Sequence, residues 1–207
     1  MCTSIRTAST AVVAALALAL AIGSASANRL SYSETKFRII WASLRFSESG
    51  GNFPITCPVT LEGSFVARTL TKTREATVGY INRASVNSPG CTEGQATILS
   101  ETLPWTVKYQ SFTGTLPNIT SVRHSLIGAA FQVEPGLGIV CLARSSEAHP
   151  AAGEANREAG GNITSLTPDA SLPLPITGNA CPTAGIFGGS GEVYVQGTTQ
   201  RVRLSLI

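Results

Sequence analysis

The sequence has few of the side chains that carry catalytic and metal chemistry. Among its 207 residues there are two histidines, His124 and His149, far apart in the chain, and a single aspartate, Asp169. Ser-His-Asp chemistry would have to use these residues or a glutamate, and no G-x-S-x-G turn precedes a helical segment. Residues 185–191 are glycine-rich but lead into a strand-like segment, whereas a phosphate-binding loop leads into a helix. We therefore expect no cofactor and no metal.

Positive charge is sparse and scattered. There are 15 lysines and arginines against 12 acidic residues, which gives a formal net charge of +3. Near the end of the chain, Arg201 and Arg203 alternate with Val202 and Leu204, which is typical of the polar face of a strand. A nucleic-acid-binding surface needs a basic cluster, so we expect no nucleic-acid partner.

No hydrophobic run is long enough to cross a bilayer, which takes about 20 residues in a helix. The longest apolar run, residues 11–22, follows Arg6 and is itself followed by small residues that end in an A-x-A pattern at Ala27. This order is typical of a secretory signal peptide. We predict that residues 1–27 are removed by cleavage after Ala27 and that residues 28–207 form one secreted domain that does not span a membrane.

Cysteine is also scarce, and the first of the five, Cys2, would leave with the signal peptide. The remaining four are Cys57, Cys91, Cys141 and Cys181. An even number in an exported chain predicts two disulfides rather than a zinc site, because no two of them have the close spacing of zinc ligands. Four cysteines allow three pairings. We favour Cys57–Cys91 with Cys141–Cys181 because each pair closes a contiguous stretch of chain, at a gain of roughly 4 kcal/mol per loop.

The sequence does contain an alternation of apolar and polar residues with a period of two, which indicates half-buried strands. The apolar positions of the clearest segments are Cys57, Val59, Leu61, Phe65, Leu103, Trp105, Val107, Tyr109, Val193, Val195, Val202, Leu204 and Leu206. Turn-forming Gly, Pro, Asn and Ser separate these segments. We predict an all-β, disulfide-bonded domain, either a single antiparallel barrel-like sheet or a β-sandwich of about 8–10 strands.

Some segments depart from simple alternation. The apolar positions change parity after Ile39 and again after Leu126, which predicts the β-bulges or bends that curled sheets need. Residues 145–161 lack bulky apolar side chains, and we expect an exposed excursion there, with at most one helical turn. Tyr80 and Tyr109 share the apolar faces of their segments and are expected in the core.

Three residues are candidates for a functional site. His124 lies between Val122 and Leu126 on an expected inward face, where a core histidine is the plainer interpretation. Glu62 and Glu101 both border apolar strands, and they are the glutamates to examine for glycoside hydrolysis, which uses paired carboxylates. Spacing in the sequence does not bring any of these residues together.

Four stretches resemble a group of small secreted bacterial proteins of unknown function. They are residues 57–65 (CPVTLEGSF), 101–105 (ETLPW), 111–117 (SFTGTLP) and 189–191 (GSG), the last followed by paired strands. The resemblance covers most of the mature chain. It implies export and an all-β body, and it implies no particular activity.

These features predict a secreted, non-enzymatic β-domain that binds a small ligand, a glycan or a component of the cell envelope. The alternative is an extracellular hydrolase that uses a glutamate or His124. An outer-membrane barrel is disfavoured, because such barrels carry aromatic girdles and aromatic residues make up only 6% of this chain. The shape of the interior distinguishes a carrier of small molecules from the other binding functions, since a carrier needs a hollow core.

Overall fold

The computed structural model describes residues 29–52 and 54–207. This part of the chain forms sixteen β-strands and one short 3-10 helix, η1 (Ser100–Thr102). The expected all-β, antiparallel, barrel-like fold is therefore confirmed, with more strands than predicted because several are only three or four residues long. The predicted signal peptide and its cleavage after Ala27 lie outside the described residues. Among the described residues, no helix has the length and apolar character needed to cross a membrane.

The strands alternate along the chain with turns and loops. Their bounds are β1 (Arg29–Tyr32), β2 (Lys36–Glu48), β3 (Ile55–Phe65), β4 (Thr69–Thr71), β5 (Thr77–Val86), β6 (Gln95–Ile98), β7 (Trp105–Thr115), β8 (Asn118–Ile127), β9 (Ala130–Gly136), β10 (Ile139–Arg144), β11 (Ala151–Arg157), β12 (Ile163–Pro168), β13 (Leu174–Thr177), β14 (Ala184–Gly188), β15 (Glu192–Val195) and β16 (Leu204–Leu206).

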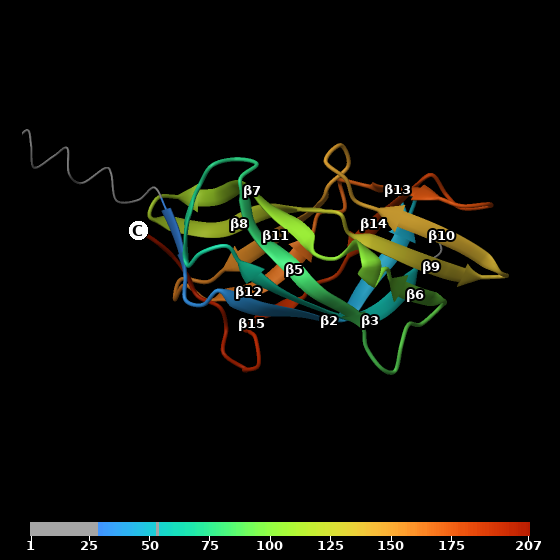
Figure 1. Cartoon of the computed structure of the whole chain (residues 1–207), viewed down its shortest axis with the longest axis horizontal. Helices are drawn as coiled ribbons and strands as arrows, with labels where there is room; N and C mark the ends of the chain where they lie inside the picture. Colours follow the sequence, from blue (N-terminus) through green and yellow to red (C-terminus); the bar gives the residue numbers. More distant parts are fainter. Residues whose placement is uncertain (1–28, 53) are drawn as a thin grey trace, which may run out of the picture.

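Most strands form one curled sheet whose two ends return to its middle (Figure 1). Its order is β12-β11-β8-β7-β5-β3-β2-β14-β13-β10-β9-β6, with β15 also paired to β2. At one end, backbone hydrogen bonds between Leu166 and Gly191 (2.7 and 2.9 Å) join β12 to the segment that enters β15. At the other end, backbone bonds between Thr56 and Thr92 join the segment before β6 to β3.

The result is two lobes that share β2 and β3. The first lobe consists of β5, β7, β8, β11, β12 and β15 with residues 36–41 of β2 and 59–65 of β3. The second lobe consists of β6, β9, β10, β13 and β14 with residues 44–48 of β2 and 55–57 of β3. A separate small sheet, β16-β1-β4, lies at the far end of the first lobe, on the left in Figure 1.

Strand β2 belongs to both lobes because its side-chain pattern changes parity in the middle. Phe37, Ile39 and Trp41 are buried, and after two exposed residues Leu44 and Phe46 are buried in turn. The register with β3 shifts between Trp41 and Leu44. The expected bulge is therefore present, but it follows Trp41 rather than Ile39. At roughly 3.3 Å per residue, the 13 residues of β2 span about 40 Å, enough to serve both lobes.

Strands β14 and β15 pair with the two halves of β2 in turn, and residues 189–191 carry the chain between them opposite the bulge. A β-carbon at Gly189, whose φ is +106°, would lie 2.6 Å from the backbone oxygen of Ser43. A β-carbon at Gly191 would lie 2.5 Å from the Trp41 ring. Only glycine fits both positions, so this glycine-rich segment has a structural role at the crossing between the lobes.

An aromatic cluster lies in the core at the junction of the lobes. Phe131 contacts Phe46, Trp105 and Phe187, with ring centroids 5.2–5.6 Å apart. Phe187 also packs edge-on against Phe46, at 4.9 Å. Tilted and edge-on contacts of this kind contribute about 1 kcal/mol each beyond the burial of the rings. The cluster therefore connects the cores of the two lobes and stabilises the junction between them.

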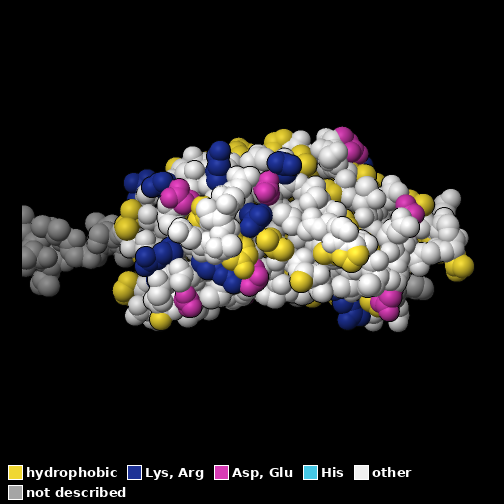
Figure 2. All heavy atoms as spheres, turned by 90° about the horizontal axis from the view of Figure 1, so that it is seen from below, with side chains coloured by type: hydrophobic (Ala, Val, Ile, Leu, Met, Phe, Trp, Pro, Cys, Tyr) yellow, Lys and Arg dark blue, Asp and Glu magenta, His cyan; other side chains and the backbone are white. Residues whose placement is uncertain are grey.

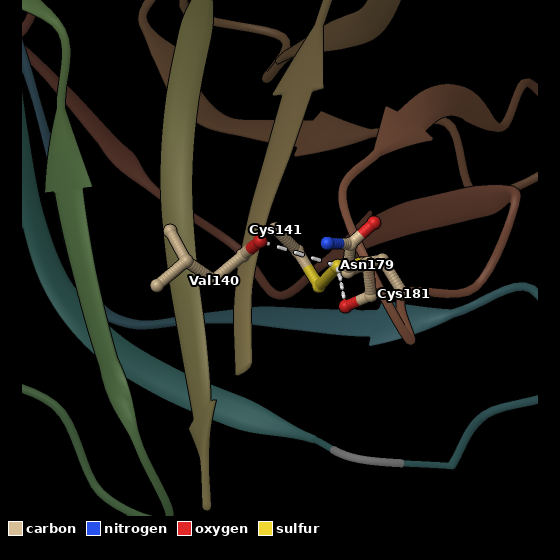
Figure 3. The surroundings of a disulfide bond; sticks show 4 residues. All are labelled: Val140, Cys141, Asn179 and Cys181. Atoms are coloured by element: carbon tan, nitrogen blue, oxygen red, sulfur yellow. Dashed lines mark hydrogen bonds between the residues drawn. A yellow bond between two sulfur atoms is a disulfide. The ribbon is translucent and has the colours of Figure 1, made fainter. Parts of the chain in front are cut away.

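Both disulfides lie in the second lobe. Cys57 on β3 is bonded to Cys91, ahead of β6, and Cys141 on β10 is bonded to Cys181, ahead of β14. This is the pairing that we favoured from the sequence. Figure 3 shows how the second bond fastens β10 to the loop that leads into β14, with Sγ of Cys181 3.4 Å from the carbonyl oxygen of Val140. Each bond holds one part of the second lobe closed.

Two expectations for single segments are wrong. Residues 145–161 are not an exposed excursion, because they contain β11, which pairs with β8 on one side and β12 on the other. Tyr80 is 38% exposed, because register shifts with both neighbours of β5 turn it outward, whereas Tyr109 is buried as expected. The parity change after Leu126 is a bend at Gly128, between β8 and β9.

The two lobes should differ in their dependence on the disulfides. Replacing Cys141 and Cys181 together by alanine opens a loop with a sequence separation of 40 residues, and we expect the free energy of unfolding to fall by about 4 kcal/mol. Amide hydrogen exchange should accelerate in β9, β10 and β13 and should stay slow in β7, β8 and β11. Equal acceleration in both lobes would contradict the two-lobe description.

Candidate functional site

A cavity of about 150 Å³ lies inside the first lobe. Phe37, Ile39, Leu61, Ile81, Ile163 and Val193 form much of its wall. It extends to the aromatic cluster at the junction, where Phe131 and Phe187 line it. A second hollow, of about 70 Å³, lies in the second lobe beside Cys141 and Phe46. The larger cavity is the candidate site.

Space for this cavity comes from β11, whose inward positions are all small. Ala151, Gly153 and Ala155 share the inward face of β11, and all three line the cavity. A β-carbon at Gly153 would lie 3.4 Å from the Leu166 side chain and 3.4 Å from the backbone oxygen of Thr167, which is van der Waals contact without a clash. Protein interiors are normally packed as densely as organic crystals. The run of small residues therefore leaves a gap that neighbouring side chains do not fill.

His124 faces the cavity from β8. In the register of the sheet it stands between Tyr109 on β7 and Gly153 on β11. Its ring is half-buried, but its Nε2 atom is shielded from solvent and has no hydrogen-bond partner among the described residues. Burial in this apolar wall lowers the pKa of His124 from 6.5 to about 4. The imidazole is therefore neutral at pH 7.

Two further cavity residues bury a polar atom without a partner. Tyr32, at the end of β1, stacks on Phe65 with ring centroids 3.9 Å apart, and its hydroxyl has no partner among the described residues. Burial raises the pKa of Tyr32, and the nearby Tyr109 raises it further, so the phenol stays protonated. Trp41 on β2, packed against Gly191, leaves its Nε1 atom unpaired in the same way. Three residues of the largely hydrocarbon wall thus each bury a polar atom that has no partner among the described residues.

The two candidate glutamates do not join His124 at the cavity. Glu62 lies on the outer face of β3, where it pairs with Arg83 (3.6 Å) and accepts a hydrogen bond from Gln196 (3.0 Å). Glu101 lies in η1 and is exposed. In the described chain no glutamate or aspartate lines the cavity, and no three His, Cys, Asp or Glu side chains cluster as metal ligands would.

Ionised side chains lie on the outer face of the first lobe. Lys108 pairs with Glu147 (2.6 Å), and Arg123 pairs with Asp169. A hydrogen bond from Ser171, reinforced by Arg123, holds the pKa of Asp169 below its usual range, so the single aspartate is a structural ion-pair partner. Figure 2 shows charged side chains mainly over the half of this face nearest the grey trace, which is the first lobe. These charged groups thus lie outside the cavity, whose lining contains no acidic residue, lysine or arginine.

The sequence pattern predicts His124 as an inward residue but gives no signal for its partners in the cavity wall. Tyr32 belongs to a strand of four residues, too short for a clear alternation, and Trp41 adjoins the bulge, which obscures its parity. The inward residues of β11 are small, so its sequence shows no alternation of bulky apolar side chains. The two-residue spacing of its small residues, with Glu154 and Asn156 on the opposite face, is the signal that identifies it as a strand.

Comparison with known proteins assigns the chain to no family. No protein-family model, no curated protein and no solved structure matches it. The resemblance to small secreted bacterial proteins therefore stays a prediction from the sequence. The function has to be argued from the geometry of the cavity.

The buried imidazole makes stability depend on pH within a defined window. Because the pKa of His124 is about 4 in the folded protein and 6.5 ordinarily, the unfolded chain binds the proton more readily between these values. We expect the free energy of unfolding to fall by up to roughly 3 kcal/mol through this group as the pH drops from 6.5 to 4, with no further change below that range. Urea unfolding of the wild type and of His124→Phe across this window measures the difference.

The second histidine provides the control. His149 is exposed on the loop before β11, so His149→Phe should follow the pH dependence of the wild type. If the wild type and His124→Phe lose stability in parallel over the window, the description of the cavity wall is wrong.

Proposed function

We propose that the mature domain is an exported binding protein that holds a small, uncharged, mostly apolar molecule in the cavity of the first lobe. The observation that carries the proposal is an interior space of about 150 Å³ with a largely hydrocarbon wall. Export is supported by the two disulfides, because such bonds form and persist in oxidising compartments.

The cavity is costly to keep, which favours a functional origin. Side chains that border unfilled space lose the dispersion contacts that a packed core would give them. One larger residue at an inward position of β11, such as Ala155, would fill much of the space. Three small residues in successive inward positions therefore encode the cavity directly.

The size and polarity of the space limit the ligand. An apolar cavity of about 150 Å³ accommodates a molecule of the size of benzene, whereas pockets for larger ligands measure about 300–1,000 Å³. An ionised ligand would lose its hydration without gaining a counter-charge. A glycan would bring many hydroxyl groups that this wall cannot pair. Of the ligand classes predicted from the sequence, a compact uncharged molecule fits the cavity.

The hydrolase alternative has less support. His124 has no carboxylate beside it, and Glu62 and Glu101 lie on the outside of the described fold. General acid–base catalysis needs a second group that orients the histidine or activates a water. We therefore develop only the binding function.

Toluene is a suitable first probe because it is apolar, uncharged and built on a single ring. At a tenfold excess over its dissociation constant, a ligand that binds only the native state adds about 1.4 kcal/mol to stability. For a domain of this size, we expect toluene to raise the melting temperature of the mature protein by roughly 3–5 °C. Scanning calorimetry in sealed cells measures the shift.

Variants of β11 make the test specific to the cavity. Ala155→Leu places a larger side chain in the space and should abolish the toluene shift, and Ala151→Leu serves the same purpose if the first variant is unstable. Ala148→Leu lies on an exposed loop and should respond like the wild type. No shift in the wild type, or an undiminished shift in a folded Ala155→Leu protein, would contradict the proposal.

A further inference from the structure

The unpaired polar atoms around the cavity narrow the class of ligand. Within the described chain, four buried side-chain nitrogen or oxygen atoms lack a hydrogen-bond partner. Three of the four belong to cavity-lining residues: Tyr32 Oη, Trp41 Nε1 and His124 Nε2. Native proteins leave few such atoms unpaired, because each costs about 1–3 kcal/mol. Their concentration around one cavity calls for a partner from outside the chain.

The three side chains reach the cavity from separate parts of the fold, and their unpaired atoms are covered by neighbouring atoms. Tyr32 comes from the small β16-β1-β4 sheet, Trp41 from β2 beside the bulge, and His124 from the middle of β8. Tyr109 stands opposite His124 in the register of β7 and β8. Tyr109 is also close enough to Tyr32 to raise the pKa of its phenol. The phenol of Tyr32 and the imidazole of His124 therefore lie at the same end of the lobe. Apolar residues of similar size would pack this wall without leaving unpaired atoms, so packing alone does not account for the three polar side chains.

The chemistry of the three atoms defines what can satisfy them. The indole N–H of Trp41 only donates, the hydroxyl of Tyr32 donates or accepts, and a neutral imidazole nitrogen accepts or donates according to its tautomer. A hydroxyl or carbonyl oxygen matches this set, whereas a carboxylate or an ammonium group would bring an unbalanced charge into a hydrocarbon wall. All three atoms are shielded from solvent, so a rotation of the side chain has to accompany contact with a ligand.

We propose that the ligand of the cavity carries an uncharged hydroxyl or carbonyl oxygen on a compact apolar body, and that Tyr32 and His124, which lie at the same end of the first lobe, hydrogen-bond this oxygen. The inference rests on the proposed function and narrows it from apolar molecules in general to ring-sized alcohols, phenols or ketones. The body of the ligand packs against the small residues of β11 and the aliphatic wall, and the oxygen lies toward Tyr32 and His124.

Phenol and toluene test the inference because they match in shape and differ in one group. In a cavity without polar partners, phenol would bind about tenfold more weakly than toluene, because its hydroxyl would lose its hydrogen bonds to water and form none in the cavity. We expect phenol to bind the mature protein at least as tightly as toluene, measured by isothermal titration calorimetry at pH 7.

Conservative variants assign the preference to named side chains. Tyr32→Phe and His124→Phe each remove one partner, and each should weaken phenol binding about fivefold while toluene affinity changes by no more than about twofold. Tyr80→Phe, at a partly exposed tyrosine, and His149→Phe, at an exposed histidine, are matched controls. Both controls should bind the two probes as the wild type does.

The outcomes separate this inference from the proposed function. Toluene binding with phenol about tenfold weaker, and without any response to Tyr32→Phe or His124→Phe, overturns the inference and leaves the apolar binding function in place. Failure of both probes to bind overturns the two together. Tyr32→Phe without a probe should melt no lower than the wild type, because it removes an unpaired buried hydroxyl, and a clear fall in its melting temperature would contradict the assignment.

Discussion

The pairing of β2 with β3 across a change of side-chain parity is the constraint on which the rest of the fold depends. Antiparallel pairing fixes which residues face inward, and a slip by one residue would turn an entire apolar set toward solvent. The one extra residue between Trp41 and Leu44 instead turns the second half of β2 toward a different interior. Glycines in residues 189–191 let the chain cross at the same level. Two small cores can therefore form on one shared pair of strands.

The two lobes reach stability by different means. The second lobe is closed by two disulfides and has only a small hollow, whereas the first lobe is closed by backbone bonds at Leu166 and Gly191 and has ion pairs on its outer face. Exposed ion pairs contribute little each, typically about 0–1 kcal/mol. The first lobe thus carries a destabilising cavity without covalent reinforcement, while the second supports the shared strands. This division is consistent with binding in one lobe and structural support from the other.

The sequence was sufficient for the fold class because alternation and cysteine number are local properties. The sequence left three disulfide pairings open, and the structure contains the favoured one, in which each pair encloses its own stretch of chain. Prediction failed where the information was non-local: Tyr80 faces outward because of register shifts with two partner strands, and β11 is a strand because β8 and β12 lie on either side of it. The site shows the same limit. His124 was predictable as an inward residue, but its proximity to Tyr32 depends on strands about ninety residues apart. The only trace of a cavity in a sequence is a set of small residues at inward positions.

The central claim is that the interior of the first lobe is an apolar cavity and not a packed core. Xenon tests it most directly, because xenon enters dry, hydrocarbon-lined cavities and needs no specific chemistry to bind there. Crystals of the protein pressurised with xenon should show an anomalous-difference peak bounded by β11 on one side and by Ile39 and Leu61 on the other. Density for side chains or for a cluster of ordered waters in that space, without xenon, would contradict the account.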